Sequence, residues 1–204
     1  MKIIGLTGPT GAGKSTLCEK IKEWGIPCIN TDDIYHSIIS YPSPCVKELQ
    51  NTFGDSIIDE KGSLNRPALA KIVFEDPNEK ESLQILNDIT HKYIWEETQK
   101  IITQYANRGK KAVILDAPVL FSSKIFVESC TLIISVICDK EIRLERLLSR
   151  DGISKEQLLN RINAQPSNEF FVENSDYCII NDGEKEDMIH RLELIFDQEG
   201  IRLK

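Results

Sequence analysis

The sequence predicts a three-layer α/β fold in which helices cover both faces of a five-stranded parallel sheet. Short apolar runs alternate along the chain with stretches of helical periodicity, as in strands joined by crossover helices. The runs are apolar at successive positions, which is typical of parallel strands buried on both faces. A chain of 204 residues is long enough for one substantial core, so we expect a single domain over residues 1–204.

The expected strands are the short apolar runs Lys2–Thr7, Pro27–Asn30, Ala112–Asp116, Leu132–Cys138 and Tyr177–Ile180. The expected helices are the amphipathic stretches between and after them: Lys14–Glu23, Asn78–Tyr105, Lys140–Arg150 and Glu184–Gln198. Because Asn78–Tyr105 is long for one crossover helix, we expect two helices there, with a break near Thr90. Together with Ser43–Phe74, these helices are expected to project as a lobe over the edge of the sheet.

The composition argues against several classes of function. Hydrophobic residues make up 41% and charged residues 28%, as in an ordinary globular protein, and the net charge of −7 argues against general nucleic-acid or membrane binding. No apolar run reaches membrane-spanning length and no signal peptide is recognised, so a cytoplasmic protein is expected. The six cysteines include no C-x-x-C pair, which favours reduced thiols over a zinc site or disulfides. The oligomeric state is left open.

A glycine-rich loop after the first strand matches the phosphate-binding pattern G-x-x-x-x-G-K-[ST] at Gly8–Ser15. Its glycines permit a tight turn that directs backbone N–H groups at phosphate oxygens, and the following helix adds the positive end of its dipole. Lys14 is placed to reach the β- and γ-phosphates, and the Ser15 hydroxyl to ligate Mg²⁺. The expected nucleotide-binding residues of the loop are Gly8, Thr10, Gly11, Ala12, Gly13, Lys14, Ser15 and Thr16.

Three classes of protein share such a loop. A guanine-nucleotide switch would also carry N-K-x-D, which is absent, and "DEKG" at Asp59–Gly62 reads as a polar turn although it fits D-x-x-G. A motor ATPase is usually larger or depends on partner subunits. A small-molecule kinase needs only the loop, a carboxylate near the acceptor hydroxyl, and arginines over the transferring phosphate.

A carboxylate candidate follows the second strand, where ligands of such sheets gather. Asp32 is the stronger candidate to accept the acceptor's proton or to help hold the metal, and Asp33 is the weaker one. The alternative is that Thr31 or Asp32 caps the following helix, and the two roles can coexist.

Arginines recur at three- and four-residue spacing in "KEIRLERLLSRDG". This spacing places Arg143, Arg146 and Arg150 on one helical face, where their guanidinium groups suit phosphoryl oxygens. The alternative is a solvated face on which Glu141 and Glu145 pair with them.

Several further segments fall between and after these motifs: "GIPCINTDDIYH", "FGDSIIDEKGSLNRPALAKIVF", "THKYI", "LDAPVLF", "RLERLLSRDGISKEQLLNRINAQ" and "DYCIINDG". In this order, and with the phosphate loop, they resemble the dephospho-coenzyme A kinase family along nearly the whole chain. The second is the most specific, because no general nucleotide-binding argument requires it.

The resemblance implies ATP-dependent phosphorylation of the ribose 3′-hydroxyl of dephospho-coenzyme A, giving coenzyme A and ADP in the last step of coenzyme A biosynthesis. It implies a P-loop kinase fold with an acceptor-binding helical lobe at about residues 43–107 and a lid at about 140–165. Lys14, Asp32, Arg146 and Arg150 would be catalytic, and Ser15 and Asp32 would hold Mg²⁺. The acceptor would contact Arg66, His91, Pro118 and Leu120, and Asn181 would approach the adenine of ATP.

Each of the more distant assignments has an alternative. Arg66 could pair with a carboxylate, His91 could form hydrogen bonds at a helix break, and Asn181 could cap a turn. The chain also departs from the family pattern: Asn30 replaces an acidic residue, Ser122 replaces a glutamate, and Phe170–Val172 occupies a region that is often basic. Two other functions therefore stay open, another nucleotide or nucleoside kinase and a regulatory nucleotide-binding switch.

Overall fold

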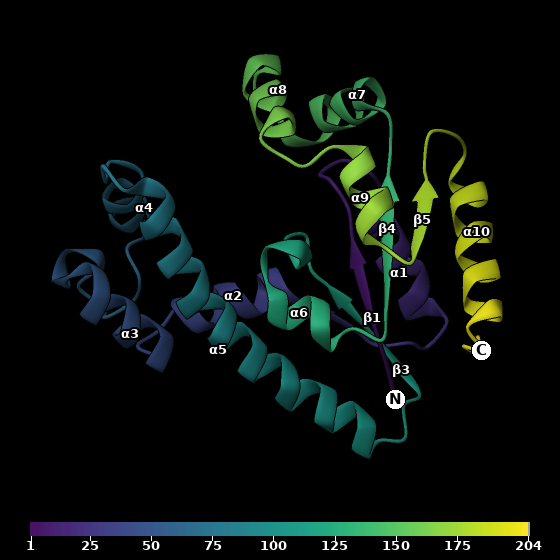
Figure 1. Cartoon of the computed structure of the whole chain (residues 1–204), viewed down its shortest axis with the longest axis horizontal. Coiled ribbons are helices and arrows are strands. Elements are labelled where there is room, and N and C mark those ends of the chain that lie inside the picture. The colour runs from purple at the N-terminus through teal and green to yellow at the C-terminus, as the bar shows by residue number, and fades with distance from the viewer. Residues whose placement is uncertain (204) are drawn as a thin grey trace.

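A five-stranded parallel sheet lies at the centre of the computed structural model, which describes residues 1–203 (Figure 1). The strands are β1 Lys2–Thr7, β2 Cys28–Asn30, β3 Ala112–Asp116, β4 Leu132–Ile137 and β5 Tyr177–Ile180, in the order β2-β3-β1-β4-β5. Every neighbouring pair is parallel, so all carboxyl ends lie at one edge of the sheet. This confirms the predicted fold class.

Helices connect the strands and cover both faces of the sheet. They are α1 Lys14–Glu23, α2 Thr31–Ile39, α3 Pro44–Phe53, α4 Arg66–Phe74, α5 Glu79–Asn107, α6 Lys124–Ser129, α7 Lys140–Asp151, α8 Lys155–Asn163, α9 Asn168–Asn174 and α10 Lys185–Gln198. Two short 3₁₀ turns, Asp55–Ile57 and Leu120–Ser122, complete the described structure. No helix within residues 1–203 is long and apolar enough to cross a membrane.

Two apolar cores hold the layers together, one on each face of the sheet. On one face, α1 and α10 bury side chains such as Leu17 and Phe196 against β1 and β4. On the other, α2, α5 and α6 bury side chains such as Trp95 and Phe126. Burial of apolar area on both faces explains why the strands are apolar at most positions.

Helix α5 runs without interruption for 29 residues, so the predicted break near Thr90 is wrong. The segment contains no proline or glycine that would end a helix. Thr90 Oγ1 donates to the carbonyls of Leu86 and Asn87 within the helix, at 2.8 and 3.2 Å. The helix is long because its two halves have different partners: the first packs on α3 and α4, and the second on the main sheet.

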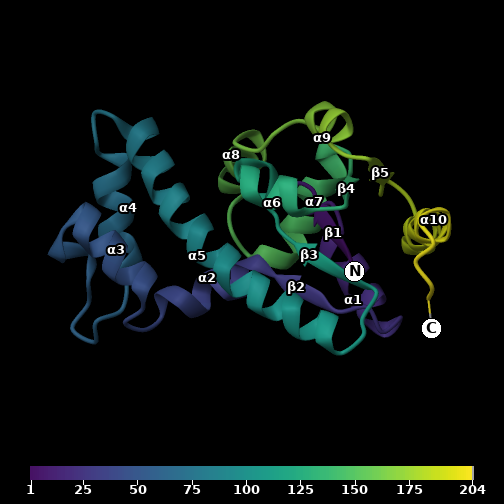
Figure 2. The same cartoon turned by 60° about the horizontal axis from the view of Figure 1, so that its bottom comes forward.

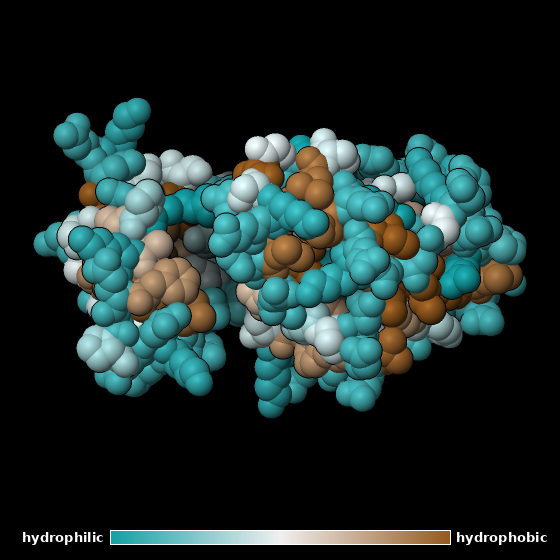
Figure 3. All heavy atoms as spheres, turned by 90° about the horizontal axis from the view of Figure 1, so that it is seen from above, coloured by the Kyte–Doolittle hydropathy of each residue, from teal (hydrophilic) through white to brown (hydrophobic). Residues whose placement is uncertain are grey.

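The lobe formed by α3, α4 and the first half of α5 extends to one side of the sheet in both ribbon views (Figures 1 and 2). Local signals start its helices: the Ser43 and Asn65 side chains cap α3 and α4, and each helix has a proline in its first turn. Seen from above, a hollow separates this lobe from the body of the molecule (Figure 3).

Helices α7 and α8 form a hairpin above the carboxyl edge of the sheet. Gly152 ends α7 with φ 64°, and Ser154 begins α8 through a capping box with Gln157. The hairpin has an apolar cluster of its own, in which Leu147, Leu158 and Ile162 are buried. This cluster holds α7 and α8 against each other.

Thr98 on α5 provides a test of the fold. Its side chain is fully buried, and its hydroxyl has no hydrogen-bond partner among residues 1–203. Valine has the same shape without the hydroxyl, so Thr98→Val is expected to raise the free energy of unfolding by about 1 kcal/mol. The exposed Thr103, whose hydroxyl donates to Gln99, provides the control Thr103→Val. Urea unfolding measures both; a Thr98→Val protein no more stable than the wild type would contradict the expectation.

Candidate active site

A cavity of about 480 Å³ opens at the carboxyl edge of the sheet. The phosphate loop forms its floor, Asn30, Asp32, Asp116 and Pro118 form one wall, and the α7–α8 hairpin forms the other. The parallel sheet explains this convergence, because residues that follow different strands meet at the same edge.

Glycines let the phosphate loop pack closely against neighbouring segments at positions where a larger residue would clash. A Cβ atom at Gly8 would lie 2.1 Å from the Val136 carbonyl oxygen, and one at Gly13 would lie 2.2 Å from Asn181 Nδ2. Both residues also have positive φ angles, 143° and 103°. Immediately afterwards α1 begins at Lys14, so the N-terminus of this helix faces the cavity.

Lys14 Nζ forms an ion pair with Asp116 at the end of β3. Both side chains are largely buried, with exposed fractions of 13% and 8%. The pairing of β1, β3 and β2 brings Asn30 beside the same carboxylate, and Asn30 Nδ2 donates to Asp116 Oδ2 at 3.4 Å. Sequence analysis did not select Asp116 as a site residue. The rule that selected Asp32, a carboxylate at the carboxyl end of a buried strand, applies to it equally.

Asp32 lies in the first turn of α2 and faces the cavity. Asn30 caps this helix by accepting the N–H groups of Asp32 and Asp33 at 2.8 and 3.1 Å, so the alternative, a cap by Thr31 or Asp32, is not what the structure shows. The Asp32 carboxylate is therefore not used for capping. Partial burial raises its pKa above the ordinary value, Lys14 opposes this, and Asp116 adds to it.

The three arginines of α7 do not share one environment, although their spacing placed them on one face. Arg143 is buried, whereas Arg146 and Arg150 line the cavity. Arg150 Nε lies 2.5 Å from the Asp151 carboxylate, which also binds Arg161 of α8 at 3.2 Å. Arg161 lines the cavity as well and was not selected from the sequence, since it lies on another helix.

Arg143 ties the hairpin to the phosphate loop. Its Nε donates to the Thr10 carbonyl and its Nη2 to Gln165 Oε1, both at 2.8 Å. Gln165 Oε1 also accepts the Thr10 N–H at 3.1 Å. The position of the loop therefore depends on Arg143 of the hairpin and on Gln165, which follows it.

Asn181 follows β5 and lies behind the phosphate loop. Its side chain is buried, and Nδ2 donates to the Ala12 carbonyl at 2.7 Å. It also lines a small cavity of about 210 Å³ with Thr16, Gly183 and Met188, on the far side of the loop from Asp32. Asn181 thus supports the loop and borders this second cavity.

The four residues expected at the acceptor lie in different places. Pro118 lines the catalytic cavity. Arg66 is exposed on the lobe with its guanidinium carbon 5.9 Å from the centre of the Tyr35 ring, so its partner is an aromatic ring and not a carboxylate. His91 is buried in mid-helix against Phe126, where burial lowers its pKa, and no helix break exists there. Leu120 is fully buried beneath Gly5 and presents no surface to a ligand.

The oxygen donors near the loop fit Mg²⁺. Ser15 is exposed in the cavity and lies with Asp32 and Asp116 on its lining. Residues 1–203 contain no group of three or more histidine, cysteine or acidic side chains placed to hold a metal ion. Mg²⁺ is commonly held by one or two protein oxygens together with substrate phosphates and water, so a complete protein cage is not required.

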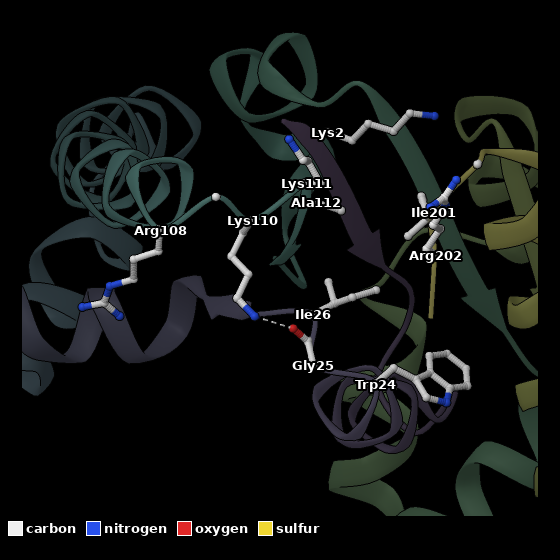
Figure 4. Close-up of a pocket in the computed structure, with 12 residues that line it drawn as sticks. Lys2, Trp24, Gly25, Ile26, Arg108, Lys110, Lys111, Ala112, Ile201 and Arg202 are labelled. Atoms are coloured by element: carbon white, nitrogen blue, oxygen red, sulfur yellow. Dashed lines mark hydrogen bonds between the residues drawn. The ribbon is translucent and has the colours of Figure 1, made fainter. Parts of the chain in front are cut away.

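Another cavity, of about 570 Å³, lies at the opposite edge of the sheet beside Trp24, Ile26 and Ala112 (Figure 4). Several cationic side chains line it, but two are already used: Lys2 pairs with Glu199, and Lys110 Nζ donates to the Gly25 carbonyl at 2.8 Å. The length of the sheet separates this cavity from the phosphate loop, so it cannot take part in chemistry at Lys14.

Known proteins are similar to this chain in sequence and in fold over most of its length. A Bacillus cereus dephospho-CoA kinase is 37% identical over 181 residues, which cover 89% of this chain and 88% of that protein. A crystal structure from Thermus thermophilus covers 97% of both chains with a TM-score of 0.76 and 28% identity. A dephospho-CoA kinase from Campylobacter jejuni covers 99% of this chain and 100% of its own, with a TM-score of 0.69 and 24% identity, and so shares the fold.

The family model described as dephospho-CoA kinase matches residues 2–187, from the first strand into the last helix. This match includes the phosphate loop, Asp32, Asp116 and the arginine-bearing hairpin. With the catalytic cavity and the similarity to the Bacillus cereus enzyme, it shows that the chain belongs to the dephospho-CoA kinase family.

Proposed function

We propose that this protein transfers the γ-phosphoryl group of ATP to the ribose 3′-hydroxyl of dephospho-coenzyme A, forming coenzyme A and ADP. Family membership supports a kinase that uses ATP. The observation that carries the proposal is the placement of Lys14, Asp32 and the hairpin arginines around one cavity. A regulatory nucleotide-binding switch would not require a carboxylate beside an acceptor position.

The phosphate loop and Lys14 hold the β- and γ-phosphates of the donor. Backbone N–H groups of the loop and the N-terminus of α1 surround the phosphates, while Lys14 supplies a positive charge that Asp116 keeps in place. Ser15 and the nearby carboxylates Asp32 and Asp116 would hold Mg²⁺. When bound, that ion neutralises charge on the phosphate oxygens.

Asp32 accepts the proton of the acceptor hydroxyl as the oxygen attacks the γ-phosphorus atom. The bond to the β,γ-bridging oxygen breaks, and that oxygen leaves with ADP. The negative charge on the transferring group is stabilised by Arg146, Arg150 and Arg161, which line the cavity from the hairpin. Closure of the hairpin would exclude water and so favour transfer over hydrolysis.

The first test is a product assay by mass spectrometry with Mg²⁺-ATP and dephospho-coenzyme A. We expect coenzyme A, and we expect Asp32→Asn to lower kcat by about 10²–10⁴-fold because the amide cannot accept the proton. Asp33→Asn, the exposed neighbour in the same helical turn, is the matched control and is expected to remain active. ADP formed equally without any acceptor would contradict the proposal, and phosphorylation of AMP or adenosine alone would change its substrate.

The pH dependence of kcat/KM tests the role of Asp32 as a base. Only the ionised carboxylate accepts a proton, so the rate falls as the pH drops through its pKa. Because burial raises that pKa, we expect half-maximal activity at a pH above the ordinary aspartate value of about 3.9. Circular dichroism at each pH checks that the protein stays folded, and a rate that is flat down to the ordinary value would count against this role.

Arg150→Ala tests the hairpin. If Arg150 stabilises the transferring group, kcat is expected to fall by about 100-fold while the dissociation constant of ATP changes little. Single-turnover kinetics separates the two effects. Arg108→Ala, at the end of α5 far from the loop, is the control. Unchanged turnover with only weaker ATP binding would show that Arg150 is a binding residue.

A further inference from the structure

A fourth cavity, of about 340 Å³, adjoins the catalytic cavity and is not used by the mechanism. The two cavities share Gly8, Pro9, Pro118 and Gln165 on their linings, so they lie next to each other along the phosphate loop. A group attached to a molecule in the catalytic cavity can therefore be placed in the neighbouring one.

The walls of this cavity are mainly aromatic. The Phe121 and Phe170 rings meet edge to face, with centres 5.4 Å apart and planes at 88°, and the Phe170 and Phe171 rings meet at 85° with centres 5.7 Å apart. Phe171 is buried and anchors the group, whereas Phe121 and Phe170 stay partly exposed. Val119, also on the wall, is 53% exposed. Apolar surface is thus left uncovered beside the catalytic cavity.

The helix that bears Phe170 and Phe171 is held firmly in place. The Ser167 side chain accepts the Phe170 N–H at 3.4 Å, and Asn168 Nδ2 donates to the Cys138 carbonyl just beyond β4, at 3.1 Å. Because α9 is tied to the sheet, the cavity wall is formed before a ligand arrives.

The two ends of the phosphate loop distinguish the donor side from the acceptor side. Loop amides hold the α- and β-phosphates, and Lys14 reaches the β- and γ-phosphates. The donor's nucleoside therefore lies toward Thr16 and the small cavity beside Asn181. The acceptor lies at the other end, beside Asp116 and Pro118.

We infer that the aromatic cavity binds the purine of the acceptor, an inference that rests on the proposed function. In dephospho-coenzyme A the purine is attached to the same ribose that carries the reacting 3′-hydroxyl. When that hydroxyl is beside Asp32, the purine lies about one sugar ring away, and the aromatic cavity adjoins the cavity that Asp32 lines. A flat base stacks well on phenylalanine rings. Gln165 Oε1 already accepts from Thr10 and Arg143, so this amide offers its Nε2 as a donor to the polar edge of the base. The Ser122 hydroxyl donates to the Val119 carbonyl and can still accept.

The pantetheine arm of the acceptor takes a different path. It is attached through the diphosphate at the 5′ carbon, whereas the base is attached at the 1′ carbon, so the arm and the base leave the ribose at different ends of the ring. The hollow between the lobe and the body in Figure 3 gives such a long, flexible chain room to lie. The aromatic cavity is thus assigned to the base, and Phe170 is assigned as a determinant of acceptor specificity.

Phe170→Ala tests this assignment in the product assay. We expect KM for dephospho-coenzyme A to rise about tenfold, as for loss of one stacked base, while KM for ATP and kcat change by less than about twofold. Phe170→Tyr keeps a flat ring and is expected to restore the wild-type KM. Val172→Ala, on the same helix and exposed but outside the cavity, is the matched control. An unchanged acceptor KM in Phe170→Ala would overturn the assignment.

Two further measurements complete the test. The first distinguishes binding of the purine in the cavity from binding of the arm there, and the second distinguishes failure of this inference from failure of the proposed function. 4′-Phosphopantetheine, which lacks the purine, is expected to inhibit the wild type and Phe170→Ala equally; weaker inhibition of the variant would place the arm in the cavity and overturn the assignment. Calorimetry of dephospho-coenzyme A binding needs no turnover. Wild-type binding without phosphorylation would refute the proposed function alone, and the assignment would then stand if Phe170→Ala weakens that binding about tenfold.

Discussion

The close packing of the phosphate loop is the constraint on which the rest of the site depends. Gly8 lies against a β4 carbonyl, Gly11 against Leu147 of α7, and Gly13 against Asn181 after β5. At each contact an added Cβ would meet atoms at 3.1 Å or less. The loop is therefore positioned by the sheet, the hairpin and the last strand together, and its backbone is held in place without any ligand.

Ion pairs balance the charge of the side chains that line the cavity, and a bound substrate can rearrange the exposed ones. Asp116 pairs with Lys14, and Asp151 pairs with both Arg150 and Arg161. The Asp151 pairs are partly exposed, so water screens them and they are weak. Triphosphate oxygens can compete for such arginines, whereas the buried Lys14–Asp116 pair keeps its lysine directed at the loop. The guanidinium groups of Arg150 and Arg161 are thus held near the cavity and stay accessible to a ligand.

Three adjoining cavities lie along one edge of the sheet. In the proposed mechanism the small cavity beside Asn181 is on the donor side, the central one would hold the reacting groups, and the aromatic one is on the acceptor side. Arg143 and Gln165 join the hairpin, the loop and the aromatic wall through shared hydrogen bonds to Thr10. A shift of the hairpin on substrate binding would therefore be transmitted to both flanking cavities.

The amino-acid sequence by itself determined the layered parallel fold, the phosphate loop and the position of Asp32 just after the second strand, because these depend on local spacing and on apolar runs that any parallel sheet must bury. Contacts between distant segments were decided only by the tertiary structure. Lys14 meets Asp116 because β1 pairs with β3, and no spacing in the chain reveals that register. Likewise, helical periodicity placed Arg143 with Arg146 and Arg150, but packing of α7 on the loop buries Arg143 and leaves the other two at the cavity. The uninterrupted helix α5 was also decided by tertiary contacts, because two separate sets of packing partners explain its length and the sequence identifies neither.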